Sequence, residues 1–309
     1  MTETAAPAEW RRQPERGSLP VMRMLAWLSL KLGRRAVQPI LRAASLYYLL
    51  SAPAAGRHAR NYLRRALGRE PALADRYRHI CAFASVILDR LFLLAGRSSQ
   101  YRISVEGEAL VREVACDGGG AILLGAHMGS FEVLRTLGEQ RPGLRIAMTM
   151  YEQNARKMSA VLSAARTQDP PEILPLGQLD SMLRIRERLE QGALVGMLAD
   201  RSLGEEATLP VRFLGSEARF PLGPMHMAAL LRQRVLFMAG LYRGGAHYHL
   251  MFEQIADFRL PPQDRTAAVA AAVERYASLV ERCCRSDPYN WFNFFDFWRD
   301  LTGPGGTGG

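Results

Sequence analysis

The sequence contains little lysine and little cysteine, and its basic N-terminal part has no long hydrophobic run. Only two of its 40 basic residues are lysines, Lys31 and Lys157. The four cysteines form no CxxC pair, which excludes a disulfide-stapled small domain and fits a reduced intracellular setting. The longest charge-free run in residues 1–70 lies at 43–56 and has 14 residues, whereas a spanning helix needs about 18. We therefore predict no membrane-spanning helix there.

Several common catalytic motifs are also missing. The sequence around Ser130 reads MGSFE and lacks the GxSxG elbow of serine hydrolases. The histidines form no HExxH-like cluster, so no metal site is predicted. The run GGGAILLGAHMG lacks the Gly-Lys-Ser/Thr ending of a phosphate-binding loop. His226, His247 and His249 have no second motif residue nearby, and we expect them to be structural.

The sequence does contain enough apolar residues for a sizeable core, and its charge is distributed very unevenly along the chain. Of 309 residues, 48% are hydrophobic and 23% are charged, which excludes a disordered chain. Residues 1–70 hold 13 Lys and Arg against 4 Asp and Glu, while the remaining residues hold 27 against 26. An isolated basic segment suits nucleic acid or an anionic membrane surface. The balanced remainder argues against a nucleic-acid binder.

The segment from Leu19 to Leu50 places arginines between large apolar and aromatic residues. This pattern favours an amphipathic helix that lies in a lipid interface, attached peripherally from the cytoplasmic side. The alternative is an ordinary helix packed on its own domain. A secretory signal is not indicated, because the segment follows a polar leader and has no clean cleavage region.

The pattern of the whole chain predicts four regions. We expect a disordered leader at 1–18, a basic amphipathic helical membrane-association region at 19–70, an α/β domain at 71–302 and a disordered tail at 303–309.

Short apolar runs such as AILLGA and ALVGMLA alternate with helical stretches in the α/β region. We expect helices at 57–68, 71–95 and about 264–285. Continuous apolar strands between helices predict an α/β fold, with a largely parallel mixed sheet covered by helices on both faces.

The run AILLGAHMGSFEVLR carries the strongest indication of chemistry. It places His127 in a loop between a buried strand and a helix that begins near Glu132, where α/β sheets bind ligands. In that arrangement we expect the Glu132 carboxylate to hold one ring nitrogen of His127 while the other nitrogen accepts a proton. We expect the backbone of Gly129 and Ser130, at the start of the helix, to stabilise a developing oxyanion and contact substrate.

These residues resemble a known family. HMGSFE after an apolar strand looks like the HX4(D/E) motif of the lysophospholipid acyltransferase superfamily, in particular its bacterial lipid A late-acyltransferase branch. LVGMLADRS and the following LPVRFLGSEARFPLGPMHMAALLRQRVLFM extend the similarity, and PYNWFNFFDFW resembles a subgroup of acyltransferase-like proteins. The resemblance covers about residues 19–300.

The resemblance implies direct transfer of an acyl group from a thioester, on acyl carrier protein or coenzyme A, to a hydroxyl of a glycolipid or lipid A-like acceptor. His127 would be the general base and Glu132 its acidic partner, with no covalent acyl-enzyme, no metal and no bound cofactor. It also implies a place on the cytoplasmic face of the bacterial inner membrane.

The resemblance further suggests substrate-site residues. Asp200 and Arg201 match its second block at a strand end, with a structural ion pair or turn as the alternative. Asn154 and Arg156 follow a strand near which the family places polar residues for the acceptor, although the spacing here departs from the usual one. Phe213, Gly215, Phe220 and Pro221 would shape the wall of the site, unless they are simply core.

Other interpretations stay open. The aromatic residues of PYNWFNFFDFW belong either to the core or to a surface that contacts acyl chain or membrane. The acceptor is alternatively a lysophospholipid, an aminolipid or a polyene lipid. A third hypothesis, of another class, is a catalytically inactive lipid-binding module.

Overall fold

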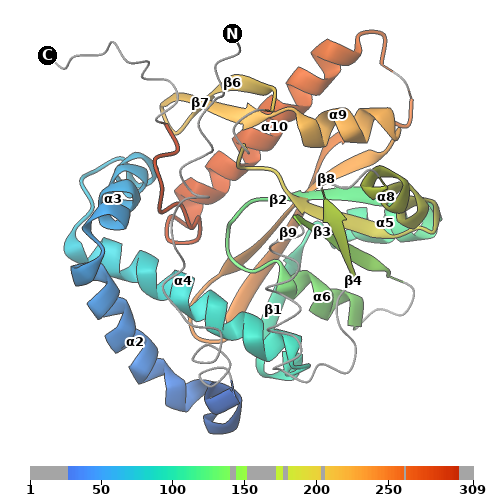
Figure 1. The fold of residues 1–309 in the computed structure, drawn as a ribbon. Helices are drawn as coiled ribbons and strands as arrows, with labels where there is room; N and C mark the ends of the chain where they lie inside the picture. Colours follow the sequence, from blue (N-terminus) through green and yellow to red (C-terminus); the bar gives the residue numbers. More distant parts are fainter. Residues whose placement is uncertain are drawn as a thin grey trace, which may run out of the picture.

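The computed structural model describes residues 27–139, 144–151, 172–176, 180–202, 206–260 and 262–298. The predicted leader and tail lie outside these residues, as do Asn154 and Arg156. Figure 1 shows a central sheet with helices packed on it, and the N-terminal helices along one side.

The described helices alternate with strands from residue 102 onward. The helices are α2 (Arg34–Ser51), α3 (Pro53–Leu67), α4 (Leu73–Leu94), α5 (Glu108–Cys116), α6 (Glu132–Glu139), α8 (Ser181–Glu190), α9 (Gly223–Leu230) and α10 (Arg265–Ser286), with a short 3-10 helix η2 (Ser98–Gln100). The strands are β1 (Arg102–Glu106), β2 (Ala121–Gly125), β3 (Ile146–Tyr151), β4 (Glu172–Leu176), β5 (Leu194–Leu198), β6 (Thr208–Phe213), β7 (Ser216–Pro221), β8 (Arg234–Tyr242) and β9 (His247–Asp257). The helices expected at 57–68, 71–95 and 264–285 correspond to α3, α4 and α10.

Seven of the strands form one sheet in the order β1-β9-β8-β2-β5-β3-β4. β8, β2, β5, β3 and β4 run parallel to one another, and β9 pairs antiparallel with β8 while β1 runs parallel to β9. The strands β6 and β7 form a separate hairpin. The predicted α/β class and the largely parallel mixed sheet are confirmed.

Helices cover both faces of this sheet, as predicted. Along β2, Ile122 and Leu124 face a core that includes α8, α9 and α10, whereas Ala121 and Leu123 face a second core with α4, α5 and α6. The alternation follows from the two-residue period of a strand, and it explains why β2 is continuously apolar. All five residues of β2 are buried.

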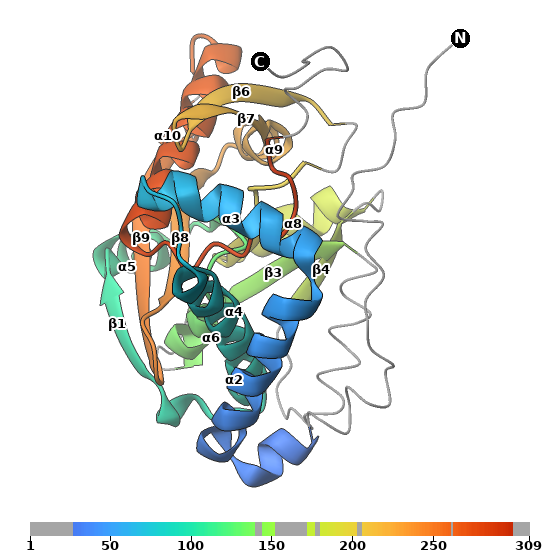
Figure 2. The same cartoon turned by 90° about the vertical axis from the view of Figure 1, so that its left-hand side faces the viewer.

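The N-terminal helices pack on the sheet domain through one face and expose the other. Val37 and Leu49 of α2 are buried, and Val37 joins the core that contains α4. Arg34 forms a bidentate ion pair with the buried Asp89 of α4, at 2.6 and 3.0 Å. The outer side exposes large apolar residues: Trp27, Leu28, Leu32, Ile40, Leu46, Tyr47, Tyr48 and Leu50. Figure 2 shows α2 and α3 along the outside of the molecule.

The structure confirms that α2 is packed on its own domain, and the lipid-interface interpretation of its exposed apolar residues stays a prediction. Among the helices that the structure describes, none is both long enough and apolar enough to cross a membrane.

Candidate active site

His127 lies where the sheet topology brings two strand ends together. It follows β2, and Asp200 follows the neighbouring parallel strand β5, so both residues lie at the carboxyl edge of the sheet. The His127 Nδ1 atom lies 2.8 Å from Asp200 Oδ1, and the His127 amide donates to Asp200 Oδ2 at 3.1 Å. The His127 carbonyl accepts a hydrogen bond from the amide of Phe292 at 2.9 Å. The imidazole is therefore held in one orientation, with Nδ1 directed at a carboxylate.

Asp200 is completely buried, and every contact it makes is with a donor. Its Oδ2 atom accepts a second hydrogen bond from the indole Nε1 of Trp291 at 2.9 Å. Burial alone raises the pKa of Asp200, but His127, Arg201 and the Trp291 hydrogen bond together hold this pKa well below its ordinary value. The Asp200 side chain is thus an ionised acceptor. The single ring proton of a neutral His127 therefore lies on Nδ1.

The surroundings of His127 keep the ring neutral. Burial and the nearby positive charge of Arg201 lower the pKa of His127 from 6.5, and the Asp200 carboxylate only partly opposes them. With Nδ1 occupied by Asp200, the Nε2 atom is left as the acceptor. A neutral histidine with a free acceptor nitrogen is the form that a general base requires.

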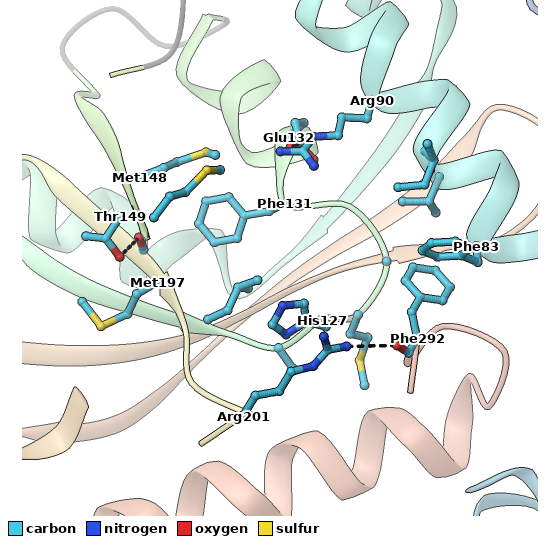
Figure 3. Close-up of a pocket in the computed structure, with 18 of the residues that line it drawn as sticks. Phe83, Arg90, His127, Phe131, Glu132, Met148, Thr149, Met197, Arg201 and Phe292 are labelled. Carbon is cyan, nitrogen blue, oxygen red and sulfur yellow. Dashed lines mark hydrogen bonds and ion pairs between the residues drawn. The ribbon is translucent and has the colours of Figure 1, made fainter. Parts of the chain in front are cut away.

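The predicted contact between His127 and Glu132 is wrong, because Asp200 takes that place. Glu132 begins α6 and turns toward α4, where it forms an ion pair with Arg90 and accepts a hydrogen bond from the Ser130 hydroxyl at 3.2 Å. Figure 3 shows Glu132 and Arg90 together at one end of the cleft and His127 beside Arg201 at the other. The positive charge on α4 determines where the carboxylate points.

The backbone amides of Gly129 and Ser130 are not available for an oxyanion. The Gly129 amide donates to the Asn290 carbonyl at 2.9 Å, and the Ser130 amide donates to the Gly240 carbonyl at 2.8 Å. Gly129 has a φ of 54°, and a Cβ there would collide with the Gly240 carbonyl. This glycine is required for close packing of the loop against β8. The expectation that these two amides stabilise an oxyanion is therefore wrong.

Arg201 supplies the positive charge beside His127. One of its terminal nitrogens donates to the Phe292 carbonyl at 3.0 Å, and its guanidinium stacks on the Phe295 ring with 4.9 Å to the centroid. The buried Nε atom has no hydrogen-bond partner among the described residues. Arg201 thus retains donor capacity next to His127.

A cleft of about 540 Å³ opens beside His127. Its wall is mainly apolar, and the side chains that form it come from α4, the β2–α6 loop, β3, β5 and the C-terminal segment. The lining includes Phe83, Val86, Ile87, Met128, Phe131, Met148, Met150, Met197, Leu198, Phe292, Phe294 and Phe295. The polar groups are concentrated at His127, Arg201 and the Arg90–Glu132 pair (Figure 3). Such a cleft suits a long apolar ligand that carries its polar, reacting group at one end.

The aromatic segment 289–298 belongs both to the core and to the site. Trp291 is buried among Tyr62, Phe213 and Phe297, with ring centroids 4.9 to 5.4 Å away. Phe292, Phe294 and Phe295 line the cleft. The interpretation as core is confirmed for Trp291, and contact with an acyl chain or membrane stays a prediction. Its hydrogen bonds to Asp200, Arg201 and the loop at Gly129 were not anticipated from the sequence.

The other predicted residues lie away from the cleft or outside the described part of the chain. Phe213 and Phe220 are buried in the core, and Gly215 lies in the turn between β6 and β7. His249 contacts Ser104 and Glu106 on β1, away from the cleft. In the described part of the chain, no cluster of three or more His, Cys, Asp or Glu side chains could hold a metal ion.

The fold and the site define an α/β protein that presents a carboxylate-bound histidine at the edge of a parallel sheet, beside an apolar cleft. Residues 17–300 match the family model of bacterial lipid A biosynthesis acyltransferases. The match spans most of the chain, and the protein therefore belongs to this family and is an enzyme that transfers acyl groups to a lipid acceptor. The resemblance noted from the sequence is confirmed at this level. No individually curated protein matched the chain.

Proposed function

We propose that the protein transfers a fatty acyl group from a thioester, carried by acyl carrier protein or coenzyme A, to a hydroxyl of a lipid A-like glycolipid. The observation that carries the proposal is the 2.8 Å contact between His127 Nδ1 and the buried Asp200 carboxylate at the mouth of an apolar cleft. The acyl chain would occupy the methionine- and phenylalanine-lined part of the cleft, and the thioester carbonyl would lie near His127.

In this mechanism His127 Nε2 removes the proton from the acceptor hydroxyl as its oxygen attacks the thioester carbonyl carbon. Asp200 stabilises the resulting imidazolium through Nδ1–H. Collapse of the tetrahedral intermediate breaks the carbon–sulfur bond, and the proton on Nε2 passes to the leaving thiolate. The products are the new ester and the free thiol.

The proposal assigns the oxyanion to Arg201. The guanidinium lies next to His127, and its Nε has no partner among the described residues. A fixed positive charge in an apolar cleft is an effective stabiliser of developing negative charge. Stacking on Phe295 and the hydrogen bond to the Phe292 carbonyl hold it in place.

Direct transfer is favoured over a covalent acyl-enzyme. The described residues that line the cleft include no serine, cysteine or lysine, and Thr149 donates its hydroxyl to the Gly196 carbonyl. Ser130 is buried and donates to Glu132 rather than to His127. The Arg90–Glu132 pair would border the acceptor at the far end of the cleft.

We further propose that the enzyme binds the cytoplasmic face of the inner membrane through the outer surface of α2. That helix exposes Ile40, Tyr47 and Leu50, and it also exposes Arg35 and Arg42. Apolar residues flanked by arginine suit the interface of an anionic bilayer.

The experiment is a transfer assay with purified protein in mixed micelles. Palmitoyl-acyl carrier protein and palmitoyl-coenzyme A are offered in parallel, each with a lipid A precursor, a lysophospholipid or an ornithine aminolipid as acceptor. Thiol release and mass spectrometry of the lipid measure the reaction. We expect acylated lipid A precursor with the wild type and none with His127→Ala. Product from another acceptor alone would contradict the proposed substrate, and full activity of His127→Ala would contradict the proposed base.

A further inference from the structure

Trp291 is the second donor to the carboxylate that orients His127. Its indole Nε1 lies 2.9 Å from Asp200 Oδ2, and both side chains are shielded from solvent, with 1% of Trp291 and none of Asp200 exposed. The residues are 91 positions apart in the sequence. A hydrogen bond between two buried side chains, one of them ionised, is stronger than a surface contact.

The indole is itself fixed by the surrounding core. Its ring makes edge contacts with Tyr62, Phe213 and Phe297 at centroid distances of 4.9, 5.4 and 4.9 Å. The Trp291 carbonyl accepts a hydrogen bond from Nε2 of the buried His79 at 2.9 Å. The position of the N–H is therefore set by packing and does not depend on Asp200.

The two oxygens of Asp200 are used differently. Oδ2 accepts from Trp291 and from the His127 amide, whereas Oδ1 is left for His127 Nδ1. Because indole is only a donor, it contacts the ionised carboxylate favourably and fixes its rotation. Without the indole, the carboxylate loses one of two contacts that keep Oδ1 directed at the imidazole.

We propose that Trp291 is a positioning residue that holds Asp200 in the rotation and charge state in which it orients His127. The inference rests on the proposed function of the same site. It makes the segment 289–298 part of the active site, since Phe292 also holds the His127 carbonyl and Arg201.

Removal of the indole N–H has a defined effect on the pH dependence. The contact with the Asp200 carboxylate raises the pKa of His127, so a carboxylate that is no longer held toward Nδ1 stabilises the imidazolium less, and loss of the indole N–H lowers the pKa of His127. The other ionisable or charged groups near Trp291, Asp200 and His127 or across the cleft are Arg201 after β5, Tyr276 and Cys284 on α10, Tyr62 on α3, His79 on α4, and the Arg90–Glu132 ion pair. None of them is altered by the substitution.

Trp298 offers a matched control in the same core. It is 7% exposed, and its ring stacks on that of Phe213 with 6.2 Å between the centroids. Its buried Nε1 has no hydrogen-bond partner among the described residues. Trp298→Phe thus removes a similar indole from the core without removing a hydrogen bond to the site.

The test compares Trp291→Phe with Trp298→Phe in the full-length protein. The titration of His127 is followed by NMR of histidine-labelled protein, with the resonance assigned from a His127→Gln sample, and kcat/KM is measured against pH. For Trp291→Phe we expect the His127 pKa and the acidic limb of kcat/KM to fall together by about 0.5 to 1 pH unit. For Trp298→Phe we expect both to stay at the wild-type value.

An unchanged or raised His127 pKa in Trp291→Phe would overturn the proposal. If Trp291→Phe does not fold, a benzothiophene analogue incorporated at position 291 replaces only the N–H by sulfur and should give the same shift. The NMR titration needs no substrate, so it separates the two proposals. If the wild type transfers no acyl group but Trp291→Phe still shifts the His127 pKa, the acyl transfer is refuted and the positioning role stands.

Discussion

His127 and Asp200 form a direct side-chain contact across 73 positions of sequence, with 2.8 Å between Nδ1 and Oδ1. The adjacent strands β2 and β5 bring them together, and the glutamate five residues after His127 pairs with Arg90 instead. Of these two acidic residues, Asp200 therefore contacts the imidazole of His127 and Glu132 does not.

The first prediction separates these two acids. Asp200→Asn removes the charge that stabilises the imidazolium and allows the wrong tautomer, so we expect kcat to fall roughly 10²- to 10⁴-fold. Glu132→Gln leaves the Nδ1 contact intact, and we expect kcat to fall less than tenfold with a larger effect on KM for the acceptor. Steady-state kinetics with both substrates varied measure the two effects. Equal losses of kcat would contradict the assignment.

The second prediction concerns pH. In the proposed mechanism His127 accepts a proton only when its ring is neutral, and burial together with Arg201 lowers its pKa from 6.5. Activity is therefore lost as the pH falls through this lowered value, and the acidic limb of kcat/KM should lie below pH 6.5. Arg201→Met removes the positive charge, so we expect the limb to move to higher pH and the maximal rate to fall. A limb that moves to lower pH in this variant would contradict the electrostatic argument.

The third prediction tests the packing under the cleft. A Cβ at Gly196 on β5 would collide with the ring of Phe131. We expect Gly196→Ala to destabilise the protein by about 1 to 3 kcal/mol and to displace the Phe131 side of the cleft. Urea unfolding measures the first effect, and KM for the acyl donor measures the second.

Two variants serve as controls for that collision. Gly119→Ala places a methyl group where no atom lies within 4 Å, and we expect no loss of stability. Phe131→Leu in the Gly196→Ala background should recover part of the lost stability, because the shorter side chain leaves room for the methyl group. Additive losses in the double variant would show that the ring is not the cause.

The fourth prediction concerns membrane binding. Ile40, Tyr47 and Leu50 are 58%, 74% and 72% exposed on α2. Substitution of all three by serine should weaken binding to phosphatidylglycerol-containing vesicles tenfold or more, because the loss of even one fully buried apolar side chain costs about 1.5 to 3 kcal/mol. Vesicle sedimentation at low and high salt provides the measurement.

The matched control changes exposed leucines on other elements. Leu183, Leu230 and Leu260 are 61%, 61% and 83% exposed, and their replacement by serine should leave vesicle binding unchanged. If the control weakens binding as strongly as the α2 variant, the membrane-binding surface does not lie on α2. Added salt should weaken binding of the wild type, since it screens arginine from anionic lipid.

The fold class and the place of His127 follow from local sequence patterns. The apolar strand AILLG and the helix that begins at Glu132 put His127 at the edge of the sheet, as the alternation of strands and helices indicated. Asp200 was singled out as a substrate-site residue at a strand end. Its contact with His127 depends on which strands are neighbours, and the order β8-β2-β5 is a tertiary property that periodicity does not encode.

The roles of Gly129 and Trp291 depended on long-range packing in the same way. A glycine before a helix looks locally like part of an anion site, but here its amide is taken by Asn290 and its α-carbon lies against β8. The aromatic composition of 289–298 indicated burial and gave no sign of the single indole N–H that faces Asp200. One signal was present in the sequence, since Asp200 and His127 each end a buried strand, and parallel strand ends meet at one edge.

The site is assembled from α4, the loop after β2, the loop after β5 and the segment 289–298, each tied to another by a hydrogen bond or ion pair. No one of these pieces retains the reactive geometry by itself. In a denaturant titration, enzymatic activity and near-ultraviolet circular dichroism should consequently be lost over the same range of denaturant concentration. We expect no partly unfolded intermediate that is still active.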